Sequence, residues 1–412
     1  MQGQQLNQDS AIRYAYIKNG NVIGQLLTIN ESPNQVPNGG PNAFLAEFLV
    51  NVGNQPLLLI SNHLRNSHQR INNIEARVFR AKSSFHPYGT ALVRMPAFFK
   101  ILFRLIKFKP DRILCGCLGF PLWACYLYAR LFSLPLVHSL HNRIVYHDSS
   151  WSKRLLAELD KFMLRRIQRV VCHGPFLRQQ LLDIGVENNK IAEFDCGFRD
   201  MWSEPEQPAA IADLSGGGEW KVITYLGRMD YSKGVSDLLE SCAARLVTDS
   251  AIRLVYIGDG ADLAHLKTLA AQKLLQDKVI FLGLLAHDKL AAVIRQSHVL
   301  VTPTRSTFPE GRCMATMEGL AMKIPVIAPN FGPFPYLVQH GVNGLLFTPD
   351  SIDDLSAKIN TALDDLDLYN RLKQGAHETS QRLLDPPLTF YKAVHWAFNA
   401  AGPSAMQGSV TT

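Results

Sequence analysis

Two apolar, strand-like segments with a helix-like segment between them constrain the fold of this 412-residue chain more than any other feature. The apolar segments are residues 298–303 and 324–328, and a Phe-Pro-Glu-Gly turn begins the connection between them. A strand, a helix and a second strand in this order favour a parallel sheet covered by helices. Ligands of such sheets bind in the crevice at the carboxyl ends of the strands. The turn at residues 308–313 is therefore predicted to lie at a ligand site.

Two glutamates and a glycine-bearing turn characterise this predicted site. Glu310 lies in the turn, and Glu318 follows within the helix-like segment. We expect Gly311, Arg312 and Cys313 to form the first helical turn, where free N–H groups and the helix dipole attract an anion. Carboxylates on either side of bare amides suit a ligand that has hydroxyl groups beside a phosphate. The alternative is that the two glutamates belong to an ordinary solvated face of a helix.

A second turn, upstream of the first, is rich in glycine and basic residues. Residues 221–226 are predicted to form a buried strand, because most of them are apolar, β-branched or aromatic. The strand runs into the sequence Gly-Arg-Met-Asp-Tyr-Ser-Lys-Gly, which contains Gly227, Arg228 and Lys233. Arginine offers a bidentate fork to phosphate and lysine a compact charge. A basic turn exposed to solvent is the alternative interpretation.

The two motifs together resemble the G-R-x4-K-G loop and the E-x7-E motif of retaining glycosyltransferases, in particular the GT4-like, or group 1, family. This resemblance implies the α/β fold called GT-B, in which two Rossmann-like, doubly wound parallel-sheet domains face a central cleft. It implies that Arg228 and Lys233 bind the donor diphosphate, with Gly227 and the amides of residues 311–313 beside them. It also implies that Glu310 holds the donor sugar and Glu318 the ribose.

The first half of the chain supplies three further candidates under the same resemblance. Gly39 and Gly40 precede a helix-like segment at residues 43–52. In the family, a Gly-Gly loop at this place lies beside the donor phosphates and the acceptor, although an ordinary loop would look the same. His141 ends a strand-like segment at residues 136–141 and matches the family's histidine near the transferred sugar. A structural histidine is the alternative.

Changes in composition along the chain suggest its domain boundaries. We expect residues 1–200 to form an N-terminal Rossmann-like acceptor domain and residues 219–382 a C-terminal Rossmann-like nucleotide-sugar-binding domain. Residues 201–218 are rich in proline and glycine and are predicted to be the linker. A helix is expected at residues 383–401, broken near Pro386 and Pro387, and the family resemblance implies that it crosses back to the first domain, as in GT-B enzymes. Residues 402–412 are expected to be a disordered tail.

The overall composition sets the class of protein. A hydrophobic content of 47% and a charged content of 19% are typical of a globular protein with large cores. The sequence has neither a long apolar run nor the pattern of a signal peptide. Its seven cysteines are scattered, without a C-x-x-C pair or zinc spacing. These features predict reduced thiols and a cytoplasmic protein with no metal site or cofactor. The family resemblance implies that the donor, a UDP- or GDP-linked sugar, binds without metal.

Positive charge is concentrated in the first half of the chain. Residues 1–200 contain 24 Lys and Arg against 13 Asp and Glu, a net charge of +11, whereas the whole chain carries +7. This distribution suits lipid headgroups or a phosphorylated acceptor, and the aromatic-plus-basic patterns of nucleic-acid binding are absent. Residues 98–108 carry cations on one helical face and apolar residues elsewhere. We therefore expect peripheral contact with the inner face of the plasma membrane, with a core-packed helix as the alternative.

The two motifs and the family resemblance that they carry imply an enzyme that moves a sugar from a nucleotide-diphosphate sugar to a hydroxyl acceptor with retention of anomeric configuration. His141, Arg228, Lys233 and Glu310 are its expected catalytic residues. By analogy with the family, the acceptor would be a glycan or a lipid-linked glycan in the synthesis of cell-surface polysaccharide, lipopolysaccharide or lipid-linked glycans. A non-catalytic GT-B binding module is one alternative. A dinucleotide-dependent oxidoreductase is another, but no G-x-G-x-x-G turn follows an early strand.

Overall fold

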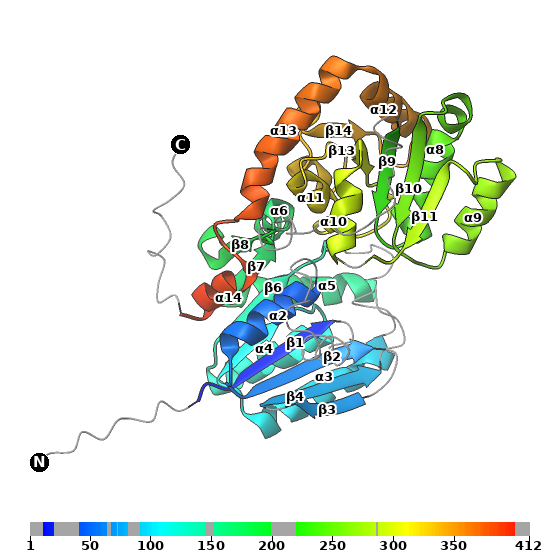
Figure 1. Cartoon of the computed structure of the whole chain (residues 1–412). Coiled ribbons are helices and arrows are strands. Elements are labelled where there is room, and N and C mark those ends of the chain that lie inside the picture. Colours follow the sequence, from blue (N-terminus) through cyan, green and yellow to red (C-terminus); the bar gives the residue numbers. More distant parts are fainter. Residues whose placement is uncertain are drawn as a thin grey trace, which may run out of the picture. The chain divides into compact units, whose positions relative to one another are not determined.

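The computed structural model describes most of the chain, and the described part divides into two compact units. The described residues are 11–19, 41–63, 67–71, 73–80, 91–144, 151–198, 220–285 and 287–399. Unit 1 contains those from 11 to 194 and from 388 onward, and unit 2 contains those from 195 to 387. In Figure 1, unit 1 therefore carries the blue and cyan elements together with a red helix near the C-terminus.

An eight-stranded sheet forms the centre of unit 1, in the order β3-β4-β2-β1-β5-β6-β7-β8. Neighbouring strands are parallel, except that β3 pairs with β4 in antiparallel fashion. The strands are β1 (Tyr14–Asn19), β2 (Leu57–His63), β3 (Ser67–Ile71), β4 (Ile74–Arg80), β5 (Arg112–Cys115), β6 (Leu136–Leu140), β7 (Arg169–His173) and β8 (Ile191–Phe194). Because β1 lies between β2 and β5, the chain winds outward from it in both directions.

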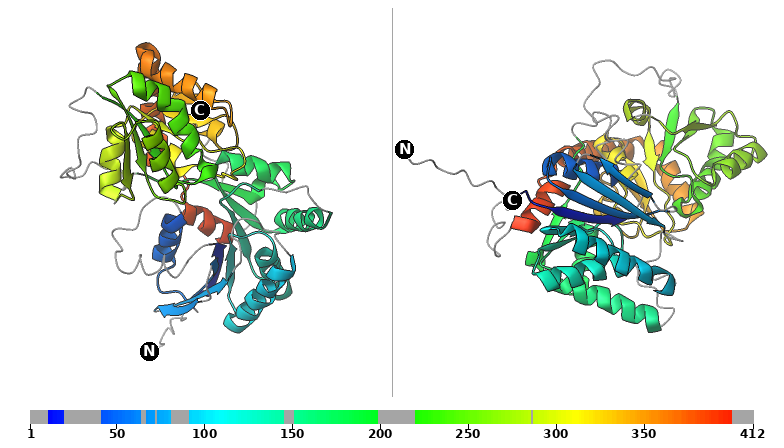
Figure 2. Two further views of the ribbon diagram at one scale, coloured as in Figure 1. Left: turned by 90° about the vertical axis from the view of Figure 1, so that its right-hand side faces the viewer. Right: turned by 90° about the horizontal axis from the view of Figure 1, so that it is seen from below.

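Helices cover both faces of this sheet, as the alternating pattern of β1 requires. Ala15 and Ile17 face the core beneath the first group of helices, whereas Tyr14 and Tyr16 point to the opposite face and contact Phe48. The first group comprises α3 (Ala91–Phe108), α4 (Phe120–Phe132), α5 (Trp151–Arg166) and α6 (Pro175–Asp183). The second comprises α2 (Pro41–Val52) and α14 (Phe390–Asn399). Figure 2 shows the cyan helices on one side of the blue strands, and the blue α2 with the red α14 on the other.

Unit 2 contains a six-stranded sheet in the order β11-β10-β9-β12-β13-β14, and every neighbouring pair is parallel. Its strands are β9 (Lys221–Leu226), β10 (Ile252–Ile257), β11 (Val279–Gly283), β12 (Val299–Val301), β13 (Val326–Pro329) and β14 (Gly344–Phe347). The strand that comes first in the sequence lies beside the one that comes fourth. This doubly wound order has its switch point between β9 and β12, and it confirms the predicted fold class.

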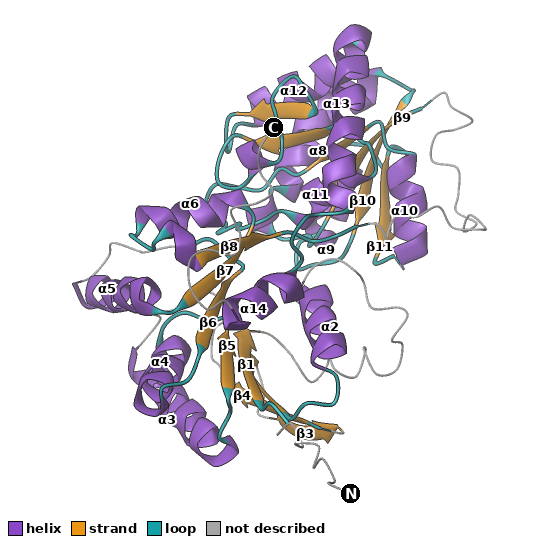
Figure 3. Cartoon of the chain, turned by 90° about the vertical axis from the view of Figure 1, so that its left-hand side faces the viewer, coloured by secondary structure: helices purple, strands orange, loops and turns teal. Residues whose placement is uncertain are grey.

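The helices of unit 2 also lie on both faces of its sheet. On one face are α8 (Val235–Thr248), α9 (Leu263–Gln272) and α12 (Ile352–Asp364), whose apolar residues share a core with Ile223 and Tyr225 of β9. The other face is covered by α10 (His287–Arg295) and α11 (Met314–Ala321), and α13 (Leu366–Leu384) packs beside α11 and α12. Short 3-10 turns occur at η2 (Asn188–Lys190), η3 (Tyr231–Lys233) and η4 (Phe334–Tyr336). Figure 3 distinguishes these helices from the strands by colour.

The helix predicted at residues 383–401 is divided in the structure near Pro386 and Pro387, where the sequence predicted the break. α13 ends at Leu384, and α14 begins at Phe390. Pro386 and Pro387 lie between them; a proline supplies no backbone N–H, and the residue before a proline avoids the helical region. The linker expected at residues 201–218 and the tail expected at residues 402–412 lie outside the described residues. Within the described part, no helix combines the length and apolar character needed to cross a bilayer.

Candidate active site

The two predicted motifs of unit 2 are neighbours in the structure. Gly227 directly follows β9, and the turn that contains Glu310 follows β12. Because β9 and β12 pair in parallel, their carboxyl ends lie side by side at the switch point of the sheet. That is the place where open α/β sheets bind their ligands.

A close backbone approach connects the two motifs. Gly234 has φ +67°, and a Cβ atom at this position would lie 1.9 Å from the carbonyl oxygen of Pro303. Only glycine fits such a conformation and such a distance. Nearby, Arg305 forms a bidentate ion pair with Asp237, with N–O distances of 2.5 and 2.7 Å. The positions of the two turns are thus fixed relative to each other.

The side chains of Lys233 and Glu310 form an ion pair at the centre of this arrangement. Lys233 Nζ lies 2.5 Å from Glu310 Oε2, and the two side chains are only 16% and 12% exposed. Nζ is also 3.8 Å from the centre of the Phe308 ring, a cation–π distance. A lysine ammonium has three donors, so the contact with one carboxylate leaves it able to bind a further anion.

Arg228 is the most accessible cation of the site. Its side chain is 54% exposed and contacts Asp230 at 3.1 Å. Its backbone carbonyl accepts a hydrogen bond of 2.6 Å from the Tyr225 hydroxyl, and burial raises the pKa of that hydroxyl. This hydrogen bond holds the backbone of the turn in place. The guanidinium group remains at the surface, where a phosphate can reach it.

The helix after Glu310 begins later than predicted. α11 starts at Met314, and Cys313 is its N-cap residue with an extended backbone (φ −82°, ψ 105°). Gly311, Arg312 and Cys313 are thus not its first turn, and the expectation of helical structure there is wrong. The free N–H groups of the helix start belong to residues 314–316, one turn further from Glu310.

An ion pair that the sequence did not reveal explains the extended segment before α11. Arg312 is buried and binds Asp195 in bidentate fashion, with 3.3 Å between Nε and Oδ1. Its Nη1 has no hydrogen-bond partner among the described residues. Cys196, next to Asp195, places its sulfur 4.0 Å from that of Met314. The segment that follows β8 therefore fixes the position of the residues before α11, and the role of Arg312 in this contact is structural.

Glu318 has an unusual environment inside α11. Burial raises the pKa of its carboxyl group from 4.5 to about 7. This carboxyl group has no hydrogen-bond or ion-pair partner among the described residues. Perturbed pKa values of this kind are common among residues at functional sites.

His141 lies in unit 1, just beyond the carboxyl end of β6. Its Nε2 shares a hydrogen bond of 2.6 Å with the Ser139 hydroxyl, and its ring lies among Phe44, Phe194 and Phe390. Burial, followed by the positive charges nearby, lowers its pKa well below 6.5. The imidazole is therefore neutral at physiological pH. Gly39 and Gly40 lie outside the described residues.

One further residue of this edge of unit 1 was not identified from the sequence. Lys18, near the carboxyl end of β1, is buried, and burial lowers its pKa to about 8. Its charge is one cause of the depressed pKa of His141. A lysine at the end of an apolar strand was the available signal. In the part of the chain that the structure describes, no three His, Cys, Asp or Glu side chains are placed to hold a metal ion.

Comparison with known families identifies the family of the chain. The family described as "Glycosyl transferases group 1" matches residues 209–379, and "Glycosyltransferase Family 4" matches residues 43–198. The chain belongs to the group 1 glycosyltransferases. Both motifs that predicted this family fall within the first match, at the switch point of unit 2. A dinucleotide-dependent oxidoreductase is thereby excluded.

Individual relatives share little sequence identity with this member of the family. The Arabidopsis thaliana sulfoquinovosyl transferase SQD2 is 24% identical over 74% of the chain and 60% of its own length. The chain thus spans less than two thirds of that relative. Sucrose-phosphate synthase from Thermosynechococcus elongatus has a TM-score of 0.64 at 19% identity, over 91% of this chain and 95% of that one. HepE from Anabaena, in complex with UDP-glucose, has a TM-score of 0.65 at 17% identity, over 94% and 98%. These structures confirm the GT-B fold.

Proposed function

We propose that this protein transfers a sugar from a nucleotide-diphosphate sugar to a hydroxyl acceptor, with retention of anomeric configuration. The Lys233–Glu310 pair at the switch point of unit 2 carries the proposal. It places a cation suited to phosphate beside a carboxylate suited to sugar hydroxyls.

The proposed donor is a uridine-diphosphate sugar, with a guanosine-diphosphate sugar as the alternative. HepE, which shares the fold, was solved with UDP-glucose. Glu318 would accept hydrogen bonds from the ribose hydroxyls, and the residues around Glu310 would hold the sugar. Gly227, which has φ +147°, lets the backbone pass close to the diphosphate. Gly39, Gly40, Gly311 and the remaining residues of both motifs would complete the donor contacts.

Catalysis by this site would be mainly electrostatic. As the bond between the anomeric carbon and the phosphate oxygen breaks, negative charge builds up on the diphosphate. Arg228, Lys233 and the free amides at the start of α11 would stabilise that charge, and preorganised groups of this kind supply large rate enhancements. His141, held neutral by its environment, would donate or accept a hydrogen bond near the transferred sugar without adding a charge. Departure and attack on the same face would preserve the anomeric configuration.

The acceptor is proposed to be a hydroxyl of a glycan or of a lipid-linked glycan, as in the assembly of cell-surface polysaccharide or lipopolysaccharide. The net charge of +11 in residues 1–200 supports an acceptor that is phosphorylated or lies at an anionic surface. Unit 1, which contains most of these residues, would provide the acceptor side of the reaction.

Thermal unfolding with a panel of UDP, GDP, ADP and their sugar conjugates, without added metal, tests the donor assignment. Ligands that bind only the folded state raise its melting temperature. We expect one nucleotide family to stabilise the wild type. Lys233→Ala should abolish this shift, whereas Lys373→Ala, at an exposed position of α13, should retain it.

Turnover of the stabilising donor tests the reaction itself. We expect Lys233→Ala to lower the transfer rate by about 100-fold or more, because it removes a charge that acts on the leaving group. Transfer by Lys233→Ala at the wild-type rate would show that the diphosphate assignment is wrong. If the wild type bound a donor but transferred its sugar to neither water nor any acceptor, a non-catalytic binding module would be the better interpretation.

A further inference from the structure

Exposed apolar side chains are concentrated on one face of unit 1. Of the 17 large hydrophobic residues that are exposed in the described chain, nine lie on α3, α4 and α5. They are Phe99, Phe103, Ile106, Leu127, Leu131, Phe132, Leu155, Leu159 and Phe162. α4 contacts both α3 and α5, so these residues belong to three adjoining helices. Exposed apolar side chains that gather on adjoining elements are a feature of interaction sites.

Helix α3 has two apolar stripes. Ile101 and Leu105 are buried against the sheet, as expected of a helix in an α/β domain. Phe99, Phe103 and Ile106 form a second stripe with spacings of i, i+4 and i+7, and they are 60%, 59% and 49% exposed. Packing within the unit accounts for the first stripe alone. The second is available to a partner.

The charge of this face is strongly positive. Neither α3 nor α4 contains an acidic residue. Of the two acids in α5, Asp160 is buried and accepts hydrogen bonds from Gly119 and Trp123. The other, Glu158, pairs with Lys161 at 2.7 Å and contacts Arg165 at 3.8 Å. The described cations of the face are Lys100, Arg104, Lys107, Arg130, Arg154, Lys161, Arg165 and Arg166.

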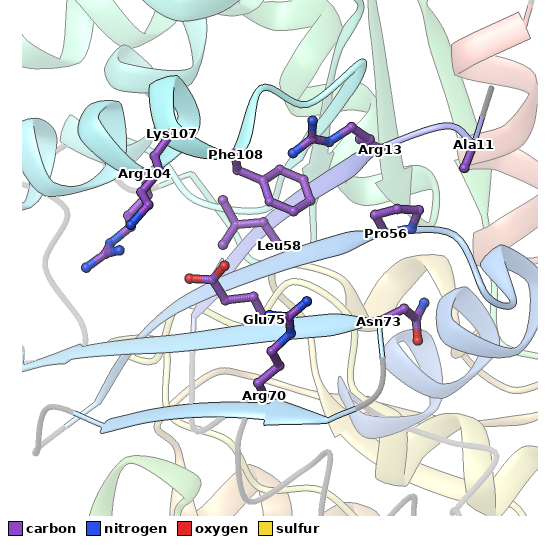
Figure 4. A pocket seen from close by; sticks show the side chains of 10 residues that line it. All are labelled: Ala11, Arg13, Pro56, Leu58, Arg70, Asn73, Glu75, Arg104, Lys107 and Phe108. Carbon is purple, nitrogen blue, oxygen red and sulfur yellow. The ribbon is translucent and has the colours of Figure 1, made fainter.

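A pocket of about 600 Å³ adjoins the cationic side of α3. Figure 4 shows Arg104 and Lys107 of this helix on one side of it, and Arg13 and Arg70 on others. Apolar lining comes from Leu58, Phe108 and neighbouring residues. The pocket thus combines four cations with an apolar wall, which suits an anion attached to a hydrocarbon group.

One carboxylate lines the pocket. The pocket and His141 lie at opposite edges of the sheet. The carboxylate, Glu75, accepts a hydrogen bond of 3.0 Å from Arg77, which offsets its charge. Most of the lining residues precede strands or end α3, so they belong to the amino edge of the sheet. His141 follows β6 at the carboxyl edge. The pocket is therefore a separate site from the proposed reaction centre.

We propose that the face formed by α3, α4 and α5 docks on an anionic lipid bilayer, and that the pocket beside α3 binds the phosphate of one lipid headgroup. The proposal does not depend on the transfer reaction. On α3, each of Arg104 and Lys107 directly follows an exposed apolar residue, about 100° around the helix. When Phe103 and Ile106 enter the acyl boundary, the two cations would lie at the level of the phosphates.

Flotation with phosphatidylcholine vesicles, with and without phosphatidylglycerol, tests the choice of partner. We expect the full-length protein to float only with the anionic vesicles and to dissociate as salt is raised. Phe103→Ser should prevent flotation while leaving the melting temperature nearly unchanged, because the side chain is exposed. Equal flotation with vesicles of phosphatidylcholine alone, or unchanged flotation of Phe103→Ser, would overturn the proposal.

A pair of matched variants separates the pocket from general charge attraction. Lys100→Gln removes one charge from the same helical stripe as Arg104, but outside the pocket. A surface charge contributes about fivefold to vesicle affinity, whereas a charge-assisted hydrogen bond to a phosphate contributes more. We expect Arg104→Gln and Arg70→Gln each to lower affinity by about tenfold or more, and Lys100→Gln by about fivefold. Equal effects of all three would refute the headgroup site.

Inorganic phosphate distinguishes a lipid ligand from a free one. If phosphate raised the melting temperature of the wild type but not of Arg104→Gln, and neither protein floated, the pocket would be a site for free phosphate and the docking proposal would be wrong. Competition by phosphate with anionic vesicles, lost in Arg104→Gln, would support it. In all these variants, a melting temperature without ligand that is close to the wild-type value would verify that unit 1, which contains every substituted residue, is folded.

Discussion

Glu318 illustrates how a residue proposed to bind ligand can reduce the stability of its own domain. Its carboxyl group has an ordinary pKa of 4.5 in the unfolded chain and about 7 in the folded protein, because burial disfavours the charged form. The folded state therefore holds this proton more tightly than the unfolded state does. Stability associated with Glu318 is complete below pH 4.5, falls as pH rises through this interval, and is lost above about pH 7.

Glu318→Gln is accordingly expected to change stability and binding in opposite directions. Above pH 7 the substitution should raise the free energy of unfolding by about 1–3 kcal/mol, and below pH 4.5 it should have little effect. It should also reduce stabilisation by the nucleotide, because the ribose would lose a charged acceptor. Melting temperatures between pH 4 and 8, with and without nucleotide, measure both effects. Glu240→Gln, at an exposed position of α8, is the control that should show neither.

At the scale of elements, the proposed donor site depends on how the turn after β9 packs against the end of β12. Gly234 cannot carry a side chain for two separate reasons, its left-handed backbone and the closeness of Pro303. Gly341 shares only the first reason: it has φ +76°, and a Cβ atom there would have no neighbour within 4 Å. Alanine substitutions at these two glycines therefore separate the free-energy cost of the left-handed backbone from the cost of the contact with Pro303.

Gly341→Ala should lower the free energy of unfolding by about 1 kcal/mol, the usual cost of a left-handed backbone for a residue with a side chain. Gly234→Ala should lower it by about 3 kcal/mol or more, because the turn must also move away from Pro303. Urea unfolding measures both values. Similar values for the two variants would mean that the turns do not hold each other as described. Nucleotide binding should weaken only in Gly234→Ala, since that variant displaces Lys233.

The sequence predicted elements whose signal is local and missed those that depend on distant contacts. The strand at residues 221–226 and the turn after it were predicted correctly, because apolar periodicity and glycine chemistry act over a few residues. No sequence pattern identified β3 and β4, which contain several polar residues. The late start of α11 could not be predicted either. It follows from the ion pair between Arg312 and Asp195, two residues that are far apart in the sequence.

At the scale of the whole molecule, the C-terminal helix belongs to unit 1 although the preceding helix belongs to unit 2. Phe390 of α14 is buried and contacts the rings of Phe44, His141 and Phe194 at 5.1–5.5 Å. Glu47 of α2 accepts a hydrogen bond of 3.1 Å from the backbone N–H of Tyr391. The last helix thus supports the ring environment of His141, and its loss would affect the proposed acceptor side directly.

Reciprocal core substitutions test whether the two units are separate in stability as well as in structure. Phe390→Ala in unit 1 and Phe334→Ala in unit 2 each remove a fully buried ring, at an expected cost of about 3–5 kcal/mol. Hydrogen exchange followed by mass spectrometry should show faster exchange of β6–β8 and α2 in Phe390→Ala, with β9–β14 unchanged. Phe334→Ala should show the reverse, because local stability follows cooperative units. If either substitution accelerated exchange equally in both sheets, the chain would be unfolding as one cooperative body. In that case, bound nucleotide should slow hydrogen exchange in both sheets. If the units are independent, it should slow exchange in unit 2 alone.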